Sequence, residues 1–325
     1  MTLAPQPATF PFYLHLGPYT IHPHFFFESL SYIIAFAVYL SLRRRFGDSI
    51  ATPFRWAAVA AAVAGAAIGA KILFWLEDPQ LTWQNMNDPA YLIGGKTIVG
   101  ALAGGLISVE LIKRYIGIRT STGDLYAIPL ALGIAIGRIG CFLTGLSDNT
   151  YGTPTNLPWA VNFGDGIPRH PTQLYEMIFL LALIPFLYQV LSKTSRQNKI
   201  VVLSDADAQS KDPYLAHRAQ PAQDSPSQKQ ICHFEGAGAN ATASRETCFS
   251  SASSSNLRQW QPGDAFKLFM VAYVSFRLLC DFLKPYPRIF LGLGGIQWAC
   301  VLLLLYYSRD VARWLRLSSM PKPQP

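Results

Sequence analysis

The sequence predicts an all-α, polytopic integral membrane protein with seven transmembrane helices. Half of its 325 residues are hydrophobic and 14% are charged, whereas about 25% charged residues is usual in a soluble domain. The mean hydropathy is positive, although one long polar segment lowers it. The apolar runs are continuous and do not alternate, which excludes a closed β-barrel, and the composition argues against an ordinary soluble enzyme.

Seven stretches are long and apolar enough to cross a bilayer, since a transmembrane helix needs about 20 residues. The third and fourth stretches are the least apolar because they are rich in Gly and Ala. We expect the seven helices near residues 25–42, 54–76, 97–117, 123–145, 172–192, 265–284 and 289–308.

The net charge of +8 comes largely from Lys and Arg clusters that follow alternate apolar stretches. This pattern is typical of cytoplasmic connections, whereas a nucleic-acid-binding protein has a continuous basic face. We therefore expect the N-terminus outside, the C-terminus in the cytoplasm and no nucleic-acid partner. The clusters are Arg43, Arg44, Arg45 and Arg55; Lys113, Arg114 and Arg119; Lys193, Arg196 and Lys199; and Arg309, Arg313, Arg316 and Lys322.

Composition divides the chain into three parts. Residues 1–192 form a membrane domain with spans one to five, residues 193–264 a polar linker, and residues 265–325 a second membrane domain with spans six and seven and a cytoplasmic tail. The linker is rich in Ser, Gln, Ala and Asp, which predicts a cytoplasmic, low-complexity and mostly disordered segment. Its two cysteines, Cys232 and Cys248, match no zinc spacing. We therefore expect neither a metal nor a cofactor.

Two arginines lie inside predicted spans, where an ionisable side chain is costly and indicates function. Counted from the cytoplasmic side, Arg138 lies roughly 22 Å along the fourth span and Arg277 roughly 18 Å along the sixth, at about 1.5 Å per residue. We expect both guanidiniums to face one polar cavity, where their planar forks suit a phosphate. The alternative is a carboxylate partner, which Asp281 offers to Arg277 from one helical turn away.

The predicted outer loop 146–171 ends in the sequence RHPTQLYE at the mouth of the fifth span. This motif places His170, Gln173, Tyr175 and Glu176 close together. Such a cluster has more polar groups than anchoring in a membrane requires, so we expect it to be functional. The alternative is a set of capping and turn residues.

Glycine pairs four residues apart are typical of close helix packing. Gly137 and Gly140 also flank Arg138, so they are candidates for close approach of a lipid headgroup to the backbone. The pairs are Gly65 and Gly69, Gly100 and Gly104, and Gly133 and Gly137.

Other polar residues lie near the outer end of the first span. Glu28 either lines the cavity or faces away from it. His15, His22 and His24 precede it, and a His-x-His pair can bind a metal. On a flexible outer segment we expect no metal site.

Four motifs follow one another along the spans: GRIGCF, YGTPTNLPWAV, RHPTQLYE and SFRLLCDFLKP. In this order they resemble the bacterial prolipoprotein diacylglyceryl transferases, with weaker matches at Gly17–Pro18 and at 94–105. The resemblance covers all seven spans and leaves out the linker. Seven spans with an outside N-terminus are also what this family has.

The resemblance implies that the diacylglyceryl group of phosphatidylglycerol moves to the lipobox cysteine of a prolipoprotein signal peptide, while glycerol phosphate leaves. The expected partners are phosphatidylglycerol, prolipoprotein signal peptides and the bilayer of a bacterial inner (plasma) membrane. Arg138 and Arg277 would bind or polarise the headgroup. The substrate-binding residues expected on this basis are Gly137, Gly140, Gly100, Gln173, Tyr175 and Glu176.

The chain departs from the family's pattern at several positions. Val99 stands where a histidine is usual, Cys141 where an asparagine is usual, Leu146 in place of an acidic residue and His24 in place of a tyrosine. A general base is therefore needed elsewhere, and His170 and His24 are the candidates. We favour His170 as the third catalytic residue beside the two arginines.

Several functions stay open at this point. The chain is either a working transferase with altered base chemistry, a variant that uses another lipid, or a non-catalytic phospholipid-binding protein on the same fold. A transporter is a further alternative, but the sequence has no repeated halves.

Overall fold

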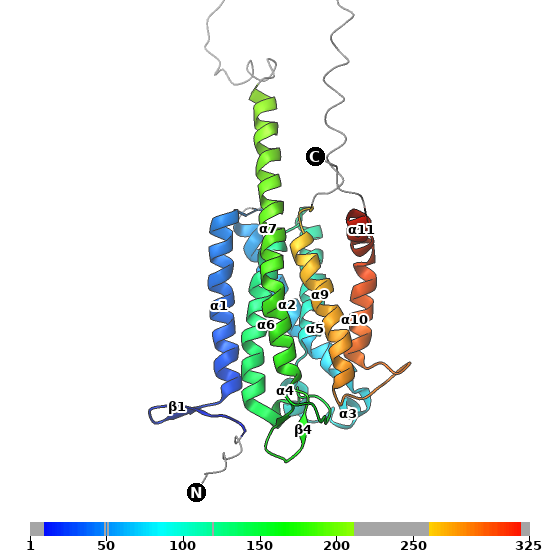
Figure 1. Cartoon of the computed structure of the whole chain (residues 1–325). Coiled ribbons are helices and arrows are strands. Elements are labelled where there is room, and N and C mark those ends of the chain that lie inside the picture. Colours follow the sequence, from blue (N-terminus) through cyan, green and yellow to red (C-terminus); the bar gives the residue numbers. More distant parts are fainter. Residues whose placement is uncertain (1–9, 49, 51, 119, 211–259, 320–325) are drawn as a thin grey trace, which may run out of the picture.

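The computed structural model describes residues 10–48, 50, 52–118, 120–210 and 260–319. These residues form a bundle of helices that run along one common axis (Figure 1). The helices are α1 (Pro23–Phe46), α2 (Thr52–Glu77), α3 (Pro79–Gln84), α4 (Pro89–Gly94), α5 (Ile98–Tyr115), α6 (Asp124–Thr144), α7 (Thr172–Ser210), α9 (Asp264–Cys280), α10 (Gly295–Tyr306) and α11 (Ser308–Ser319), with 3-10 turns η1 (Gly145–Asp148) and η3 (Asp281–Leu283).

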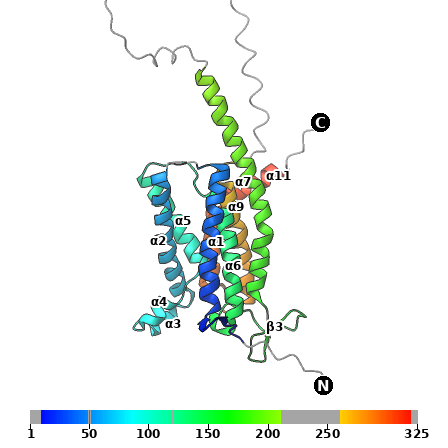
Figure 2. The ribbon, with the colours of Figure 1, turned by 90° about the vertical axis from the view of Figure 1, so that its left-hand side faces the viewer.

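Two small antiparallel hairpins lie at one end of the bundle. Strands β1 (Leu14–Leu16) and β2 (Tyr19–Ile21) pair with Leu14 opposite Ile21. Strands β3 (Val161–Asn162) and β4 (Pro168–Arg169) pair with Val161 opposite Arg169. Short helices α3 and α4 lie at the same end (Figures 1 and 2). This end therefore holds most of the irregular structure among the described residues.

Local sequence explains where the short helices begin. The Asp78 side chain accepts a hydrogen bond from the Leu81 backbone N–H at 2.9 Å, and the Asp88 side chain accepts one from Ala90. In both helices a proline follows the capping aspartate. An aspartate cap followed by proline at the first helical position is a common start of a helix.

Helices α2 and α5 pack closely because glycines face each other between them. A Cβ added to Gly69 would lie 2.3 Å from the Gly100 carbonyl oxygen, and one added to Gly65 would lie 2.5 Å from the Gly104 carbonyl oxygen. No side chain larger than hydrogen fits there. The predicted packing role of these small-residue pairs is therefore confirmed.

The remaining helices pack in a chain of neighbours: α1 on α6, α6 on α7, α7 on α9, and α9 on α10. Their interfaces are filled by fully buried apolar side chains, which include Leu180, Phe269 and Met270. This arrangement brings α6, α7 and α9 together, and these are the three helices that carry Arg138, Glu176 and Arg277.

All seven predicted stretches contain a helix, which confirms the all-α class. Within the part of the chain that the structure describes, four segments are long and apolar enough to cross a membrane by length and composition: α1, α2, α6 with η1, and α7 up to residue 195. Helices α9 and α10 are shorter, with 17 and 12 residues. Both are shorter than predicted. Helix α9 ends early because η3 follows it. Helix α10 begins late because the backbone first turns at Leu291 and Gly292, both of which have a positive φ.

The first part of the predicted linker 193–264 is helical. Helix α7 continues to Ser210, because Lys, Gln and Ala in this stretch are compatible with a helix, and it ends three residues before Pro213. Figure 1 shows this helix extending well beyond the others. The rest of the linker up to residue 259, with Cys232 and Cys248, lies outside the described residues.

The end of the bundle opposite the hairpins is basic. Three arginines, Arg43 to Arg45, occupy the last turn of α1, and Lys113 and Arg114 occupy the last turn of α5. Both helices end on the side where α7 projects (Figure 1). The alternating charge clusters read from the sequence thus gather at one end.

Candidate active site

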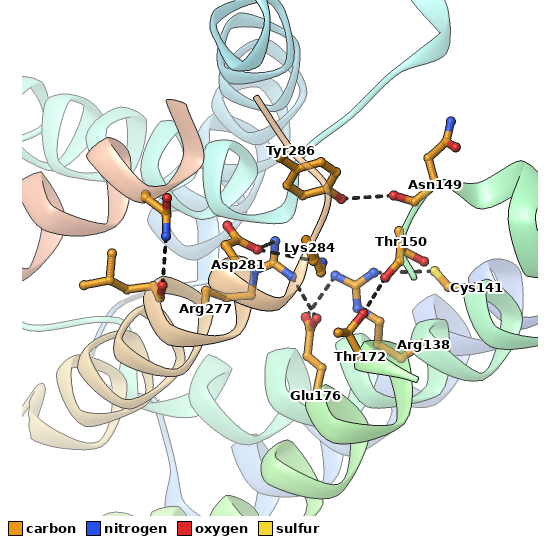
Figure 3. A network of polar contacts seen from close by, with 12 residues as sticks. Arg138, Cys141, Asn149, Thr150, Thr172, Glu176, Arg277, Asp281, Lys284 and Tyr286 are labelled. Carbon is orange, nitrogen blue, oxygen red and sulfur yellow. Dashed lines mark hydrogen bonds and ion pairs between the residues drawn. The ribbon is translucent and has the colours of Figure 1, made fainter. Parts of the chain in front are cut away.

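The candidate active site is centred on a carboxylate between two arginines. Glu176 on α7 lies 2.9 Å from Arg138 Nη2 on α6 and 3.1 Å from Arg277 Nη1 on α9. Figure 3 shows the Glu176 carboxylate pointing between the two guanidiniums. All three side chains are buried, with exposed fractions of 6% for Arg138, 4% for Arg277 and 1% for Glu176. The two arginines therefore lie together around Glu176, and Arg277 also has Asp281, the carboxylate partner that the alternative interpretation named. Their role toward a phosphate stays a prediction.

Two further charges extend this cluster. Arg277 Nη2 lies 2.9 Å from Asp281 Oδ1, and Lys284 Nζ lies 3.8 Å from the same oxygen. With all five side chains ionised, three cations face two carboxylates. These five side chains alone leave one positive charge over, which suits an anion with a single negative charge such as a phosphodiester. The Glu77 carboxylate at the end of α2 also interacts electrostatically with Arg277 and Lys284 and reduces this excess when it is ionised.

Helix geometry holds the cluster in place. Tyr273, Arg277 and Asp281 are spaced by four residues, so they share one side of α9 and its extension η3. The Tyr273 hydroxyl donates a hydrogen bond of 2.7 Å to Glu176. The carboxylate is thus held by three donors, and buried charges need such partners to remain in a protein interior.

Several buried polar atoms in this region have no hydrogen-bond partner among the described residues. The donors are Arg138 Nε, Arg277 Nε and Gln173 Nε2, and Gln173 Oε1 is an acceptor. Gln173 lies one turn before Glu176 on α7 and is 1% exposed. Native proteins rarely leave buried donors unpaired. A bound phosphate or glycerol headgroup would supply the acceptors that these groups lack.

The loop between η1 and α7 is fixed to the site by hydrogen bonds. The Thr172 hydroxyl donates to the Thr150 carbonyl oxygen at 2.6 Å, and the Tyr286 hydroxyl donates to the Asn149 carbonyl oxygen at 3.1 Å. Figure 3 shows these two contacts beside the arginines. The loop is therefore a fixed wall of the site.

His170 lies at the edge of this region and does not join the arginine cluster in any hydrogen bond or ion pair found among the described residues. Its Nδ1 lies 3.2 Å from the Tyr175 hydroxyl, which accepts a hydrogen bond from the Trp159 indole at 2.7 Å. The His170 backbone N–H donates to the Thr153 carbonyl oxygen. RHPTQLYE thus contributes Gln173 and Glu176 to the interior and His170 and Tyr175 to the surface.

The arginine of RHPTQLYE has a structural partner. Arg169 donates a hydrogen bond of 2.7 Å to Asp165 in the loop between η1 and α7. This bond, above all, lowers the pKa of Asp165 to about 2. Arg169 therefore stabilises the β3–β4 hairpin and lies outside the buried cluster.

Two of the three glycines predicted to bind substrate serve helix packing. A Cβ on Gly100 would lie 2.4 Å from the Gly69 carbonyl oxygen, and one on Gly140 would lie 2.9 Å from the Phe27 Cβ. These sides of α5 and α6 are covered by α2 and α1, which gives Gly100 and Gly140 a packing role; their substrate-binding role stays a prediction. Gly137 has open space around it and stays a candidate.

His24, the other candidate base, lies between two carboxylates. Its Nδ1 lies 2.9 Å from Asp148 and its Nε2 lies 3.4 Å from Glu28. Its role as a base stays a prediction. Glu28 and His24 line one pocket of about 370 Å³, and Glu28 therefore faces a cavity.

Sequence reasoning missed three residues. Tyr273 and Lys284 were detectable in principle. Tyr273 lies four residues before Arg277, and Lys284 lies three residues after Asp281, so each shares a helical face with its partner. Asp148 had no such signal, since its contact with His24 joins η1 to the start of α1.

Val99, where the family has a histidine, is 1% exposed in the hydrophobic core.

Comparison with known proteins points to one family. The sequence model of the prolipoprotein diacylglyceryl transferase family matches residues 11–204. This range includes Arg138 and Glu176 and ends before Arg277. The phosphatidylglycerol–prolipoprotein diacylglyceryl transferases of Bordetella parapertussis and Bordetella bronchiseptica are each 34% identical to this chain over 197 residues, which is 55% of this chain and 71% of theirs.

A relative of the same name occurs in Methylococcus capsulatus. It is 36% identical over 186 residues, or 52% of this chain and 66% of its own. The family's sequence model covers more than half of the present chain. The chain therefore belongs to the prolipoprotein diacylglyceryl transferase family.

Proposed function

We propose that this chain transfers the diacylglyceryl group of phosphatidylglycerol to the lipobox cysteine of prolipoprotein signal peptides. The proposal rests on the buried cluster of Arg138, Glu176 and Arg277, which has one excess positive charge and unpaired Nε–H groups. A phosphodiester carries one negative charge and has oxygens that accept from such groups. The match to the transferase family supports the same reaction.

The proposed roles follow from the chemistry of the step. The acceptor sulfur, as a thiolate, forms a bond to the glyceryl carbon, and the bond from that carbon to the phosphate oxygen breaks. Negative charge builds on the departing glycerol phosphate, and Arg138 and Arg277 stabilise it. Gln173 and Gly137 would contact the headgroup, Glu176 would hold the arginines in position, and Tyr175 would contact substrate at the mouth.

We propose His170 as the group that receives the proton of the acceptor thiol. It lies on the outer loop, where its ring is fixed by Tyr175. His170→Ala should lower the rate of transfer about 100-fold or more, the usual scale for a general base. The effect should shrink at high pH, because a thiol ionises unaided above a pKa of about 8.5. The assay is transfer of label from phosphatidylglycerol to a lipobox peptide across pH.

A second candidate function is phospholipid binding without catalysis, and Val99 is the observation that favours it. This buried aliphatic side chain cannot accept a proton. If the base must stand there, the natural protein transfers nothing and Val99→His gains transfer. That outcome would contradict the role of His170, whereas transfer by the natural protein excludes the non-catalytic alternative.

The proposal includes seven spans in a bacterial inner membrane, with the hairpin end outside and residues 193–264 in the cytoplasm. The test uses a protein in which all native cysteines are replaced. A cysteine introduced by Asn156→Cys, at an exposed position in the outer loop, should react with an impermeant thiol reagent in intact cells. Cys232, restored alone, should react only after the cells are opened. Labelling of Cys232 in intact cells would reverse the orientation and with it the outward-facing site.

A further inference from the structure

Beside the arginine cluster lies a second group of side chains that the transfer scheme does not use. The group brings together one nitrogen, one sulfur and one oxygen. The nitrogen belongs to His24 at the start of α1, the sulfur to Cys141 in the last turns of α6, and the oxygen to Asp148 at the end of η1. These three atoms lie within 4.8 Å of one another. Two of the three residues, His24 and Cys141, are positions at which the chain departs from the family's pattern.

The spacing of the three atoms suits a transition-metal ion. His24 Nδ1 lies 2.9 Å from Asp148 Oδ1 and 3.9 Å from Cys141 Sγ. Ligand atoms on one tetrahedral zinc lie about 3.4–3.6 Å apart, given metal–ligand bonds of about 2.0–2.3 Å. Small side-chain rotations would bring the observed atoms to these separations. Imidazole, thiolate and carboxylate are also the three ligand types that zinc uses in proteins.

The surrounding residues support the candidate ligands. His24 directs its other ring nitrogen to Glu28 Oε2 at 3.4 Å, and the Thr150 hydroxyl donates to Asp148 Oδ2 at 2.7 Å. Glu28 is itself held by Tyr32 and Lys96. A metal-bound histidine almost always has such a carboxylate or carbonyl partner, which fixes the orientation of its ring.

Backbone packing explains why the three residues meet. Gly140 faces the start of α1, and a Cβ added to it would lie 3.2 Å from the His24 Cα. This close approach sets His24 beside Cys141, the next residue on α6. Thiolate and carboxylate together carry two negative charges, which balance a divalent cation.

We propose that His24, Cys141 and Asp148 bind one zinc-type divalent metal ion, and that its open position takes the acceptor thiol. Three protein ligands leave a tetrahedral metal with one free position, as in catalytic zinc sites. The pocket of about 370 Å³ that contains His24 and Asp148 gives access to it. The second half of this proposal rests on the proposed transferase function.

The site stands next to the proposed donor site. Arg138 Nη1 lies 3.6 Å from Cys141 Sγ (Figure 3), so a metal-bound thiol and an arginine-bound phosphate would be neighbours. A coordinating thiol loses its proton, which passes to His170. The sulfur electron pair then forms the bond to the glyceryl carbon, and the electron pair of the broken carbon–oxygen bond leaves with glycerol phosphate.

Metal binding is tested with the full chain in detergent, in a Cys232→Ser/Cys248→Ser background that removes the linker thiols. We expect one Zn²⁺ or Co²⁺ per chain and a thiolate-to-cobalt charge-transfer band. Cys141→Ser should abolish the band, whereas Cys300→Ser, at a buried cysteine elsewhere, should keep it. A band that survives Cys141→Ser, or no stoichiometric ion at all, would overturn the site.

Two variants keep the test decisive if Cys141→Ser fails to fold. His24→Gln should remove a ligand and lower the affinity for Co²⁺ more than Glu28→Gln does. Glu28→Gln alters only the support of His24 and should weaken binding about 10- to 100-fold. Unchanged affinity in both folded variants would contradict the assignment.

The role of the open position is tested by adding a lipobox peptide to the cobalt protein. The peptide should change the cobalt spectrum, and a peptide with serine in place of its cysteine should not. An unchanged spectrum, together with full transfer by metal-free protein, would overturn the thiol-binding role. If the protein binds cobalt but transfers nothing with or without metal, the result would instead contradict the transferase function and would not contradict the metal site.

Discussion

Arg138→Ala should reduce diacylglyceryl transfer more than 100-fold while the protein still inserts and folds. Loss of a charge-assisted, bidentate contact to a buried phosphate costs on the order of 3 kcal/mol. Folding should survive because Glu176 keeps its contacts with Arg277 and Tyr273. The measurement is the transfer rate from labelled phosphatidylglycerol, with the thermal stability of each variant determined in detergent.

Two companion variants of the Arg138 experiment separate charge from geometry. Arg138→Lys should rescue transfer poorly, since an ammonium cannot reproduce the fork of a guanidinium. Arg44→Ala removes an exposed arginine from the opposite end of the bundle and should leave the rate unchanged. Transfer close to that of the natural protein in Arg138→Ala would contradict the headgroup assignment.

Glu176→Gln should destabilise the protein by about 3–5 kcal/mol, because it leaves two buried arginines without their shared carboxylate. The glutamine side chain has the same shape, so a loss of stability reflects charge rather than packing. Transfer should fall as well, since the guanidiniums lose the group that positions them. Unfolding in detergent, followed by denaturant or heat, measures the first effect, and the transfer assay measures the second.

The matched control is the same substitution at an ion pair whose carboxylate is exposed. Glu110→Gln removes the partner of Lys113, which lies 2.9 Å away on α5; the Glu110 side chain is 42% exposed, whereas Lys113 is buried. The loss of stability should be smaller than in Glu176→Gln, where the carboxylate and both of its partners are buried. Tyr273→Phe should fall between the two, since it removes one hydrogen bond to Glu176, worth about 1 kcal/mol. Equal stability of Glu176→Gln and Glu110→Gln would show that Glu176 is not the centre of the buried cluster.

The sequence by itself determined the helical class, the positions of the helices and the two intramembrane arginines. Hydropathy and charge clusters are local properties, so a single chain reveals them. Helix periodicity also set the depth of Arg138 and Arg277 and paired Arg277 with Asp281. The family resemblance rested on short motifs and was confirmed by the family match.

Local patterns could not reveal which side chains meet across helices. Composition suggested disorder after residue 192, whereas α7 continues as a helix to Ser210. Glycine spacing alone did not separate packing from substrate binding, and only the neighbouring helices showed that Gly100 and Gly140 serve packing. Each of these outcomes depends on what lies opposite a residue.

Only the tertiary structure decided that Glu176 joins the two arginines, and that His24, Cys141 and Asp148 converge. Glu176 and Arg277 are 101 residues apart, and His24 and Cys141 are 117 apart. No periodicity links residues at such separations. The packing of α6 against α1, α7 and α9 sets these distances, because burial of their apolar faces fixes the register at which their polar groups meet.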